Sequence, residues 1–335
     1  MRPSYICPRD RVALLMNTTS ASCPGCGSSF PIESGIVLLD SVQRPDRLAF
    51  DQSASGLDGL SAEQQTEGKR KADALLQHAG IERLRGAAVL DVGCGLGDLS
   101  YGLASSHRLE DCDIYAFDHS IQSLRVLLRS ITASSRNRVH VSTQDASALC
   151  FPDECFDLIA GSAVLHHILD YRAFLRWGFR ALKAGGTAVF MEPFLDGYFL
   201  PSLFLSIAVD QLGLNDSDLK RPEFGMCRYM IDDTSFRMQH EDDVTALDAL
   251  TDKHYFRNDR AAELAYSLGF RRISFINYEP PEFYEDFMRH FLWVYGISDQ
   301  ALTETVCRHY DLLRRMTGKM LSGIVAHFKY MVFQK

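Results

Sequence analysis

The chain has 335 residues, and 46% of them are hydrophobic, so it is long enough to build a full α/β domain with substantial additions. Its 35 basic and 43 acidic residues give a formal net charge of −8, and no stripe of Lys and Arg suggests phosphate binding, so nucleic acid is an unlikely partner. No segment reaches the roughly 20 apolar residues of a membrane span, and no secretory signal is evident. We therefore expect a cytoplasmic protein with reduced thiols and no membrane partner.

Residues 1–40 are predicted to form a small β module of their own. Cys7, Cys23 and Cys26 are grouped there, and an alternating apolar run over residues 30–39 predicts a hairpin with Gly35 at its turn. The segment resembles a zinc ribbon, in which four Cys or His ligands come in two close pairs. Here Asp10 stands at the second position of the first pair, so either a Cys3Asp zinc site or a degenerate ribbon held by its hairpin core is expected.

Residues 41–86 are interpreted as a linker and a cap helix. Residues 41–68 are rich in Ser, Gln, Asp and Gly with weak periodicity, and a helix is predicted from about Lys69 to His78. Such a segment can fold over a neighbouring site.

From residue 87 onward, apolar strands alternate with amphipathic helices, which predicts a mostly parallel sheet in an α/β fold. The expected strands cover residues 88–92, 114–117, 139–142, 158–161, 187–192, 272–276 and 327–333. The expected helices lie near residues 98–106, 120–133, 171–183 and 258–268. The last strand would be antiparallel, which gives a seven-stranded Rossmann-like sheet.

Two long insertions, residues 194–255 and 280–324, fall outside this minimal fold. Both leave the sheet at the carboxyl ends of its strands, where open α/β sheets bind ligands. We expect them to form a helical substrate lid over the Rossmann-like domain at residues 87–335. The alternative is that the insertions form an oligomer interface, for example of a homodimer. The same insertions can also serve as both a lid and an interface.

A strand that runs into a glycine-rich turn and a helix is the strongest local signal. It covers residues 89–98 and includes Asp91, Gly93, Gly95 and Gly97. Glycines let the backbone pass close to a ligand, and the helix N-terminus offers free N–H groups to an anionic group. The dinucleotide fingerprint GxGxxG fails because Asp98 stands at its last glycine.

This motif resembles motif I of the class I (Rossmann-like) S-adenosylmethionine-dependent methyltransferases, some of which carry a zinc ribbon. The resemblance implies that Asp118, after the second strand, binds the ribose hydroxyls, and that Asp145, after the third, pairs with the adenine amino group. The expected cofactor is S-adenosylmethionine. Its expected binding residues are Asp91, Gly93, Cys94, Gly95, Gly97, Asp118, His119, Asp145, Ala146 and Ser162.

Simpler interpretations stand beside these. Asp91 can cap the glycine-rich turn, Asp118 can be a helix N-cap, and Cys94 can be a small buried side chain. The joint placement of the two acidic residues favours the cofactor.

Methyl transfer needs an acceptor held in line and, for some acceptors, a base. The resemblance places His166 and His167 on the loop that faces the sulfonium, so they are the first candidates for the base. The alternative is a helical turn whose histidines bond to the backbone. Glu192, at the end of the fifth strand, is the second candidate, with bonding to nearby backbone amides as its alternative.

Three functions stay open on the sequence. The first is methylation of a small molecule, a metabolite or a natural product, which the acidic charge and the large lid favour. The second is an enzyme of the same fold that uses S-adenosylmethionine in a non-methylating reaction, such as cyclisation of its aminocarboxypropyl arm. The third is an RNA or protein methyltransferase, which the ribbon suggests.

Overall fold

The computed structural model describes residues 3–40, 51–131 and 136–335. Residues 41–50, the first part of the predicted linker, and residues 132–133, the end of a predicted helix, lie outside the described residues. The chain divides into two compact units. The sheet unit consists of Met1–Met191, Ala262–Ser274 and Tyr330–Lys335, and the helical unit consists of Glu192–Ala261 and Phe275–Lys329.

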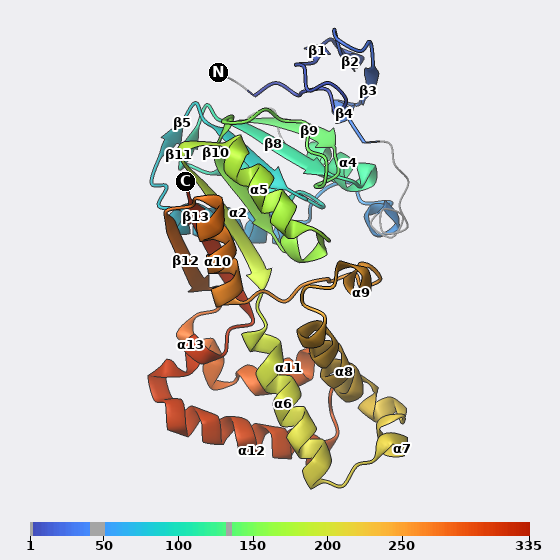
Figure 1. Cartoon of the computed structure of the whole chain (residues 1–335), viewed down its shortest axis with the longest axis vertical. Coiled ribbons are helices and arrows are strands. Elements are labelled where there is room, and N and C mark those ends of the chain that lie inside the picture. The colour runs from blue at the N-terminus through green and yellow to red at the C-terminus, as the bar shows by residue number, and fades with distance from the viewer. Residues whose placement is uncertain (1–2, 41–50, 132–135) are drawn as a thin grey trace. The chain divides into compact units, whose positions relative to one another are not determined.

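The predicted strands are all present in a mostly parallel α/β sheet (Figure 1). They are β6 (Ala88–Val92), β8 (Asp113–Asp118), β9 (Arg138–Thr143), β10 (Phe156–Ser162), β11 (Leu182–Pro193), β12 (Arg272–Asn277) and β13 (Phe328–Gln334). The first five pair in parallel in the order β9-β8-β6-β10-β11. Strand β13 follows β11, and β12 forms the edge.

The last strand runs antiparallel, as the sequence predicts. The N–H of Lys335 donates to the Gly186 carbonyl near the start of β11, whereas the N–H of Phe194, after its end, donates to the His327 carbonyl. The end of β13 therefore lies beside the start of β11, and the start of β13 lies beside the end of β11, so the two strands run in opposite directions.

Helices from the expected segments pack on this sheet. They are α2 (Ala62–His78), α3 (Asp98–Ser105), α4 (Ile121–Ser130), α5 (Tyr171–Ala181) and α10 (Asn258–Leu268). The first of them begins earlier than the predicted residue 69, because Ser61 and Gln64 form a capping box at its N-terminus. It also crosses α3 closely: a Cβ on Gly68 would lie 2.1 Å from the Asp98 carbonyl oxygen, and one on Gly102 would lie 2.0 Å from the Gly68 carbonyl oxygen.

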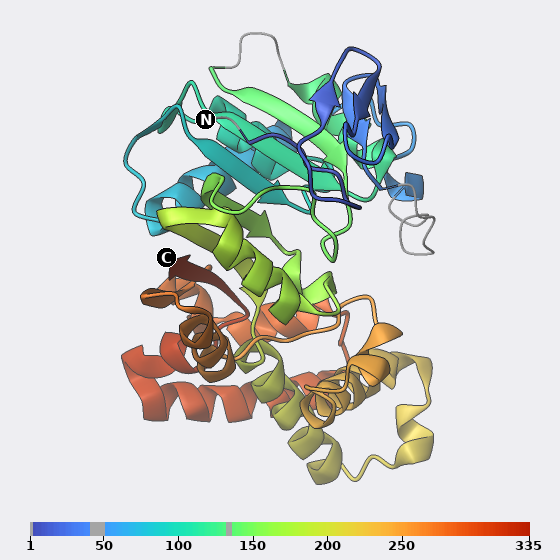
Figure 2. The ribbon, with the colours of Figure 1, turned by 45° about the horizontal axis from the view of Figure 1, so that its top comes forward.

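The N-terminal ribbon, residues 3–40, joins the main sheet instead of forming a sheet of its own (Figure 2). Its strands are β1 (Leu15–Met16), β2 (Ser20–Ser22), β3 (Ser29–Glu33) and β4 (Ile36–Leu38). The predicted hairpin is β3 and β4, and its turn places Ser34 at φ 50° and Gly35 at φ 87°. Strand β4 then pairs in parallel with β9, so the sheet has eleven strands. A separate two-stranded sheet pairs β5 (Leu84–Arg85) with β7 (Leu109–Glu110).

The helical unit contains both predicted insertions (Figure 1). Its longer helices are α6 (Asp196–Gln211), α8 (Gly225–Gln239), α11 (Phe287–Val294) and α12 (Gln300–Thr317). Its short ones are α7 (Asp216–Leu219), η2 (Pro222–Phe224), α9 (Val244–Asp248), η3 (Pro281–Glu285), η4 (Gly318–Met320) and α13 (Leu321–Ile324). Their apolar faces share one core. Among the described residues, no helix is both long and apolar enough to cross a bilayer.

A buried ion pair lies on α8, and a tyrosine outside the helix binds to it. Arg237 donates from Nε and Nη2 to the two carboxylate oxygens of Asp233, at 2.8 and 2.9 Å. The hydroxyl of Tyr255 donates to the same carboxylate, and its ring stacks on Tyr198 with a centroid distance of 3.9 Å. The pair is bidentate and its remaining acceptor capacity is used, which is the arrangement that a buried ion pair requires.

Candidate functional site

The glycine-rich loop after β6 has a backbone that only glycine adopts easily. Gly93, Gly95 and Gly97 have φ values of 56°, 53° and 91°. A Cβ on Gly93 would lie 2.3 Å from Val164 Cγ2, and one on Gly97 would lie 2.5 Å from Leu127 Cδ1. A Cβ on Gly95 would meet nothing within 4 Å, so the loop presents bare backbone to open space at this residue.

Asp118, at the end of β8, is fixed against this loop. Its Oδ2 accepts a hydrogen bond from the Gly95 N–H at 3.0 Å, and its Oδ1 accepts one from the Ser120 N–H at 2.8 Å. Ser120, and not Asp118, is the N-cap of α4. The carboxylate is therefore held at the strand end by two backbone donors, and the alternative role as a helix cap does not apply.

Asp91 lies beneath the loop on β6 and is almost fully buried. Burial, together with the nearby charges of Asp98 and Asp118, raises the pKa of its carboxyl to about 7. The Ser100 hydroxyl donates to Asp91 Oδ2 at 2.5 Å and, like the charge of Lys71, opposes that rise in the pKa. Three carboxyl groups thus influence one another here, which favours a ligand with positive charge.

Asp145 follows β9, on the neighbouring strand end. Its Oδ1 accepts hydrogen bonds from the N–H and the hydroxyl of Ser147, both at 2.7 Å. A cavity borders Asp145. Ala146, next in the chain, is half-buried. Because β6, β8 and β9 are parallel neighbours, Asp91, Asp118 and Asp145 come from successive strands of one sheet.

The remaining predicted cofactor residues lie close by in the chain. Cys94 faces away from solvent in an apolar cluster, where burial raises the pKa of its thiol well above the usual value, so it is not a nucleophile. His119 is half-buried beside Asp118. Ser162 ends β10, where it pairs with Met191 of β11.

The candidate bases occupy different elements. His166 and His167 form the 3-10 turn η1 (Leu165–His167) after β10, with ring centroids 4.0 Å apart. The first is buried and the second is half-buried. Glu192 is fully buried near the end of β11. The histidines therefore do lie on a short helical turn, as the alternative interpretation expects, and their catalytic role stays a prediction.

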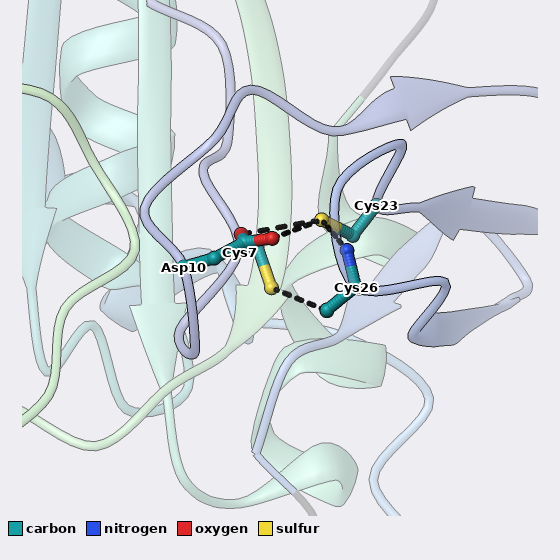
Figure 3. A group of neighbouring side chains, drawn as sticks. All are labelled: Cys7, Asp10, Cys23 and Cys26. Carbon is teal, nitrogen blue, oxygen red and sulfur yellow. Dashed lines mark hydrogen bonds between the residues drawn. The ribbon is translucent and has the colours of Figure 1, made fainter.

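Four predicted metal ligands converge in the ribbon, as Figure 3 shows. The sulfurs of Cys7 and Cys26 lie 3.6 Å apart, and the sulfur of Cys23 lies 3.2 Å from each carboxylate oxygen of Asp10. One ligand atom from each residue lies within 4.8 Å of the others. In a tetrahedral zinc site with Zn–S bonds of about 2.3 Å, sulfurs lie roughly 3.7 Å apart. The arrangement fits such an ion.

Two contacts at the site were not predicted from the sequence. Lys71 of α2 pairs with Asp98, at the start of α3, with an Nζ–Oδ2 distance of 2.7 Å. Asp51 accepts hydrogen bonds from the Ser120 hydroxyl at 2.7 Å and from the Gln122 N–H at 3.2 Å, at the N-terminus of α4. Both join residues far apart in the chain, so no local pattern signals them.

The sequence matches known methyltransferases over its central part. Residues 89–186 match a family model described as a methyltransferase domain. A demethylmenaquinone methyltransferase of Geobacillus kaustophilus is 32% identical over 108 residues, which are 32% of this chain and 46% of that protein. A ubiquinone/menaquinone biosynthesis C-methyltransferase of Xylella fastidiosa is 36% identical over 111 residues, which are 32% of this chain and 42% of that protein. The chain thus spans less than half the length of these relatives.

A comparison with solved structures also finds a methyltransferase. It is phosphoethanolamine N-methyltransferase 2 of Haemonchus contortus in complex with S-adenosyl-L-methionine, with 16% sequence identity and a TM-score of 0.45. The match covers 79% of this chain and 52% of that chain.

Proposed function

We propose that the chain, whose residues 89–186 match a methyltransferase domain model, is a class I S-adenosylmethionine-dependent methyltransferase that methylates a small organic molecule. One observation carries the proposal. The glycine loop with its open backbone at Gly95 lies against the carboxylate of Asp118 at the end of β8. Asp91 lies on β6 and Asp145 follows β9, the two strands that flank β8.

Each carboxylate has a task that its position supports. Asp118, held by two backbone N–H groups, has oxygens suited to accept hydrogen bonds from ribose hydroxyls. Asp145 is suited to accept one from the adenine amino group. Asp91 and its acidic neighbours provide a negative potential for the ammonium and sulfonium charges.

When bound, S-adenosylmethionine supplies an activated methyl group, which passes to a nucleophilic acceptor atom as the carbon–sulfur bond breaks and S-adenosylhomocysteine is left. The protein must hold the acceptor in line and exclude water. Where the acceptor also loses a proton, His166 or His167 takes it through a ring nitrogen, and Glu192 is the second candidate. For the acceptor we propose a metabolite or natural product, since the two sequence relatives above are named as a demethylmenaquinone methyltransferase and a ubiquinone/menaquinone biosynthesis C-methyltransferase.

The test is mass spectrometry of S-adenosylmethionine incubated with the protein, alone and with pooled cell metabolites. Formation of S-adenosylhomocysteine only when metabolites are present is the expected result, and a labelled methyl group then identifies the acceptor. Methylthioadenosine formed without an acceptor would instead establish the cyclising reaction. Methyl label in RNA or protein fractions would establish a macromolecular acceptor.

We also propose that Cys7, Asp10, Cys23 and Cys26 hold a structural zinc ion. The N–H groups of Gly25 and Cys26 lie 3.3 and 3.4 Å from the sulfur of Cys23 and donate to it, which stabilises a thiolate. A carboxylate is an accepted zinc ligand, so the Asp10 position does not exclude the ion.

Elemental analysis of the purified protein tests the zinc proposal. One zinc ion per chain is expected, and Cys26→Ser should lose it. Asp10→Cys, which restores four sulfur ligands, should retain zinc against a chelator for longer than the wild type. A wild-type protein with zinc at background level would instead support a ribbon held by its hairpin alone.

A further inference from the structure

A cavity of about 190 Å³ lies where the ribbon meets the loop after β9. The loop contributes Gln144, Asp145, Ala148 and Cys150 to its lining. The ribbon contributes Pro8, Leu39 and Asp40. The volume is several times the roughly 30 Å³ of one water molecule and smaller than the roughly 300 Å³ of a small pocket for a whole drug-sized ligand, so it suits one ring system of a larger ligand.

The ribbon also holds this loop in place. Three successive carbonyls of the loop accept hydrogen bonds from it: Leu149 from Arg11 Nη1 at 2.9 Å, Cys150 from the Ile6 N–H at 3.0 Å, and Phe151 from Arg11 Nη2 at 3.2 Å. The N–H of Cys150 in turn donates to the side chain of Gln144, the neighbour of Asp145. The conformation of the Asp145 loop is thus tied to the ribbon at consecutive residues.

Arg11, which binds the loop, has a left-handed backbone conformation that is uncommon for a residue other than glycine. Two ribbon turns are alike: the Arg11 N–H donates to the Cys7 carbonyl, and the Gly27 N–H donates to the Cys23 carbonyl. Arg11 has φ 61° and Gly27 has φ 71°, the left-handed region that costs a non-glycine residue about 1–2 kcal/mol. In the second turn the left-handed residue is a glycine, which adopts this backbone without that cost. In the first turn it is Arg11, whose guanidinium binds the loop after β9.

Strand pairing fixes the position of Asp40 in the lining of the cavity. The N–H of Asp40 donates to the Thr143 carbonyl at 3.1 Å, and the Thr143 hydroxyl donates to the Asp40 carbonyl at 3.0 Å. This continues the parallel pairing of β4 with β9. Asp40 therefore lies beside the residue that precedes Gln144, and Asp40 and Asp145 line the same cavity.

We propose that the ribbon is one wall of the adenine pocket. Pro8, Leu39 and Ala148 provide apolar surface for the faces of a purine ring, and Asp40 adds a second carboxylate acceptor for its exocyclic amino group. Arg11 is a positioning residue that acts through the loop. The inference rests on the proposed function, because it assigns this cavity to the adenine end of S-adenosylmethionine.

Calorimetric titration with S-adenosylhomocysteine tests it on the full-length protein. Arg11→Gly keeps the left-handed backbone and removes the guanidinium, so affinity should fall about tenfold, which corresponds to one lost charged hydrogen bond. Arg9→Gly is the matched control, because Arg9 is exposed in the same turn and should leave the affinity unchanged. Equal affinity of a folded Arg11→Gly variant and the wild type would overturn the inference.

Asp40→Asn provides a second measurement that does not depend on the folding of the arginine variant. The wild type should prefer S-adenosylhomocysteine to S-inosylhomocysteine, whose ring carries an acceptor oxygen in place of the amino group. The asparagine amide can donate to that oxygen, so this preference should fall about tenfold. An unchanged preference would contradict the role of Asp40. A wild type that binds neither ligand would contradict the proposed function itself, which separates the two failures.

Discussion

The sheet unit and the helical unit use buried charge in opposite ways. In the sheet unit, Asp91 is buried with a hydroxyl donor and other carboxyl groups near it, so its pKa is raised to about 7. In the helical unit, Asp233 is buried against a bidentate arginine and a tyrosine hydroxyl. The first arrangement leaves negative charge for a ligand to compensate, whereas the second is already neutralised. Charge substitutions should therefore affect ligand binding in one unit and stability in the other.

The largest expected effect is on stability in the helical unit. Arg237→Met leaves Asp233 buried without its cation, which should lower the free energy of unfolding by about 3–5 kcal/mol. Arg228→Met is the matched control on the same helix: its i,i+4 pair with Asp232 has side chains 46% and 66% exposed, against 6% for both partners of the buried pair. Its cost should be below about 1 kcal/mol. Urea titration measures both, and equal costs would contradict the comparison.

The second effect is on binding in the sheet unit. Asp118→Asn removes the charge from a carboxylate suited to ribose, so S-adenosylhomocysteine should bind at least about tenfold more weakly by calorimetry. Asp153→Asn is the control, since this residue is exposed and pairs only loosely with Arg180, at 3.6 Å. Weakening by both variants to the same degree would point to a general charge effect.

A third effect concerns packing beside the site. Gly68→Ala places a Cβ against the backbone of Asp98, where α2 crosses α3, and should cost about 1–3 kcal/mol. In the helical unit, Gly225→Ala meets nothing within 4 Å at the start of α8 and should be neutral or slightly stabilising. Thermal unfolding of the pair tests this, and a harmless Gly68→Ala would show that the helix crossing can open.

The smallest effect is a pH dependence from Asp91. Its pKa of about 7 in the folded chain lies above the ordinary value of 3.8, so the folded state holds an extra proton between these values. The contribution of this group to stability therefore falls as pH rises from about 4 to 7. A cationic ligand favours the ionised form, so S-adenosylmethionine should bind several-fold more tightly at pH 8 than at pH 6 and release protons.

Calorimetry in two buffers of different ionisation enthalpy measures that proton release. Asp91→Asn should abolish it, while Asp98, Asp118 and Lys71, the charged neighbours that act on this carboxyl, stay in place. A pH dependence that persists in the variant would show that Asp91 is not its source.

The two units also differ in how far the sequence predicts them. In the sheet unit, every predicted strand is present, because buried parallel strands are short apolar runs and the glycine loop is a local motif. Asp91 belongs to the glycine-rich motif itself, whereas the resemblance to methyltransferases pointed to Asp118 and Asp145, and the cofactor roles of all three stay predictions. The helical unit has no comparable motif: its helices could be located only as insertions, and its buried ion pair joins residues that look like any exposed i,i+4 pair.

The sequence by itself determined the order of strands and helices, the positive-φ glycine loop, the acidic residues at the strand ends and the grouping of Cys7, Asp10, Cys23 and Cys26, since each depends on neighbours within a few residues. Only the tertiary structure decided that β4 extends the main sheet, that Arg11 holds the loop of Asp145, and that Pro8 and Asp40 line its cavity. These contacts join residues more than a hundred positions apart, where strand pairing and side-chain packing, and no local pattern, select the partner.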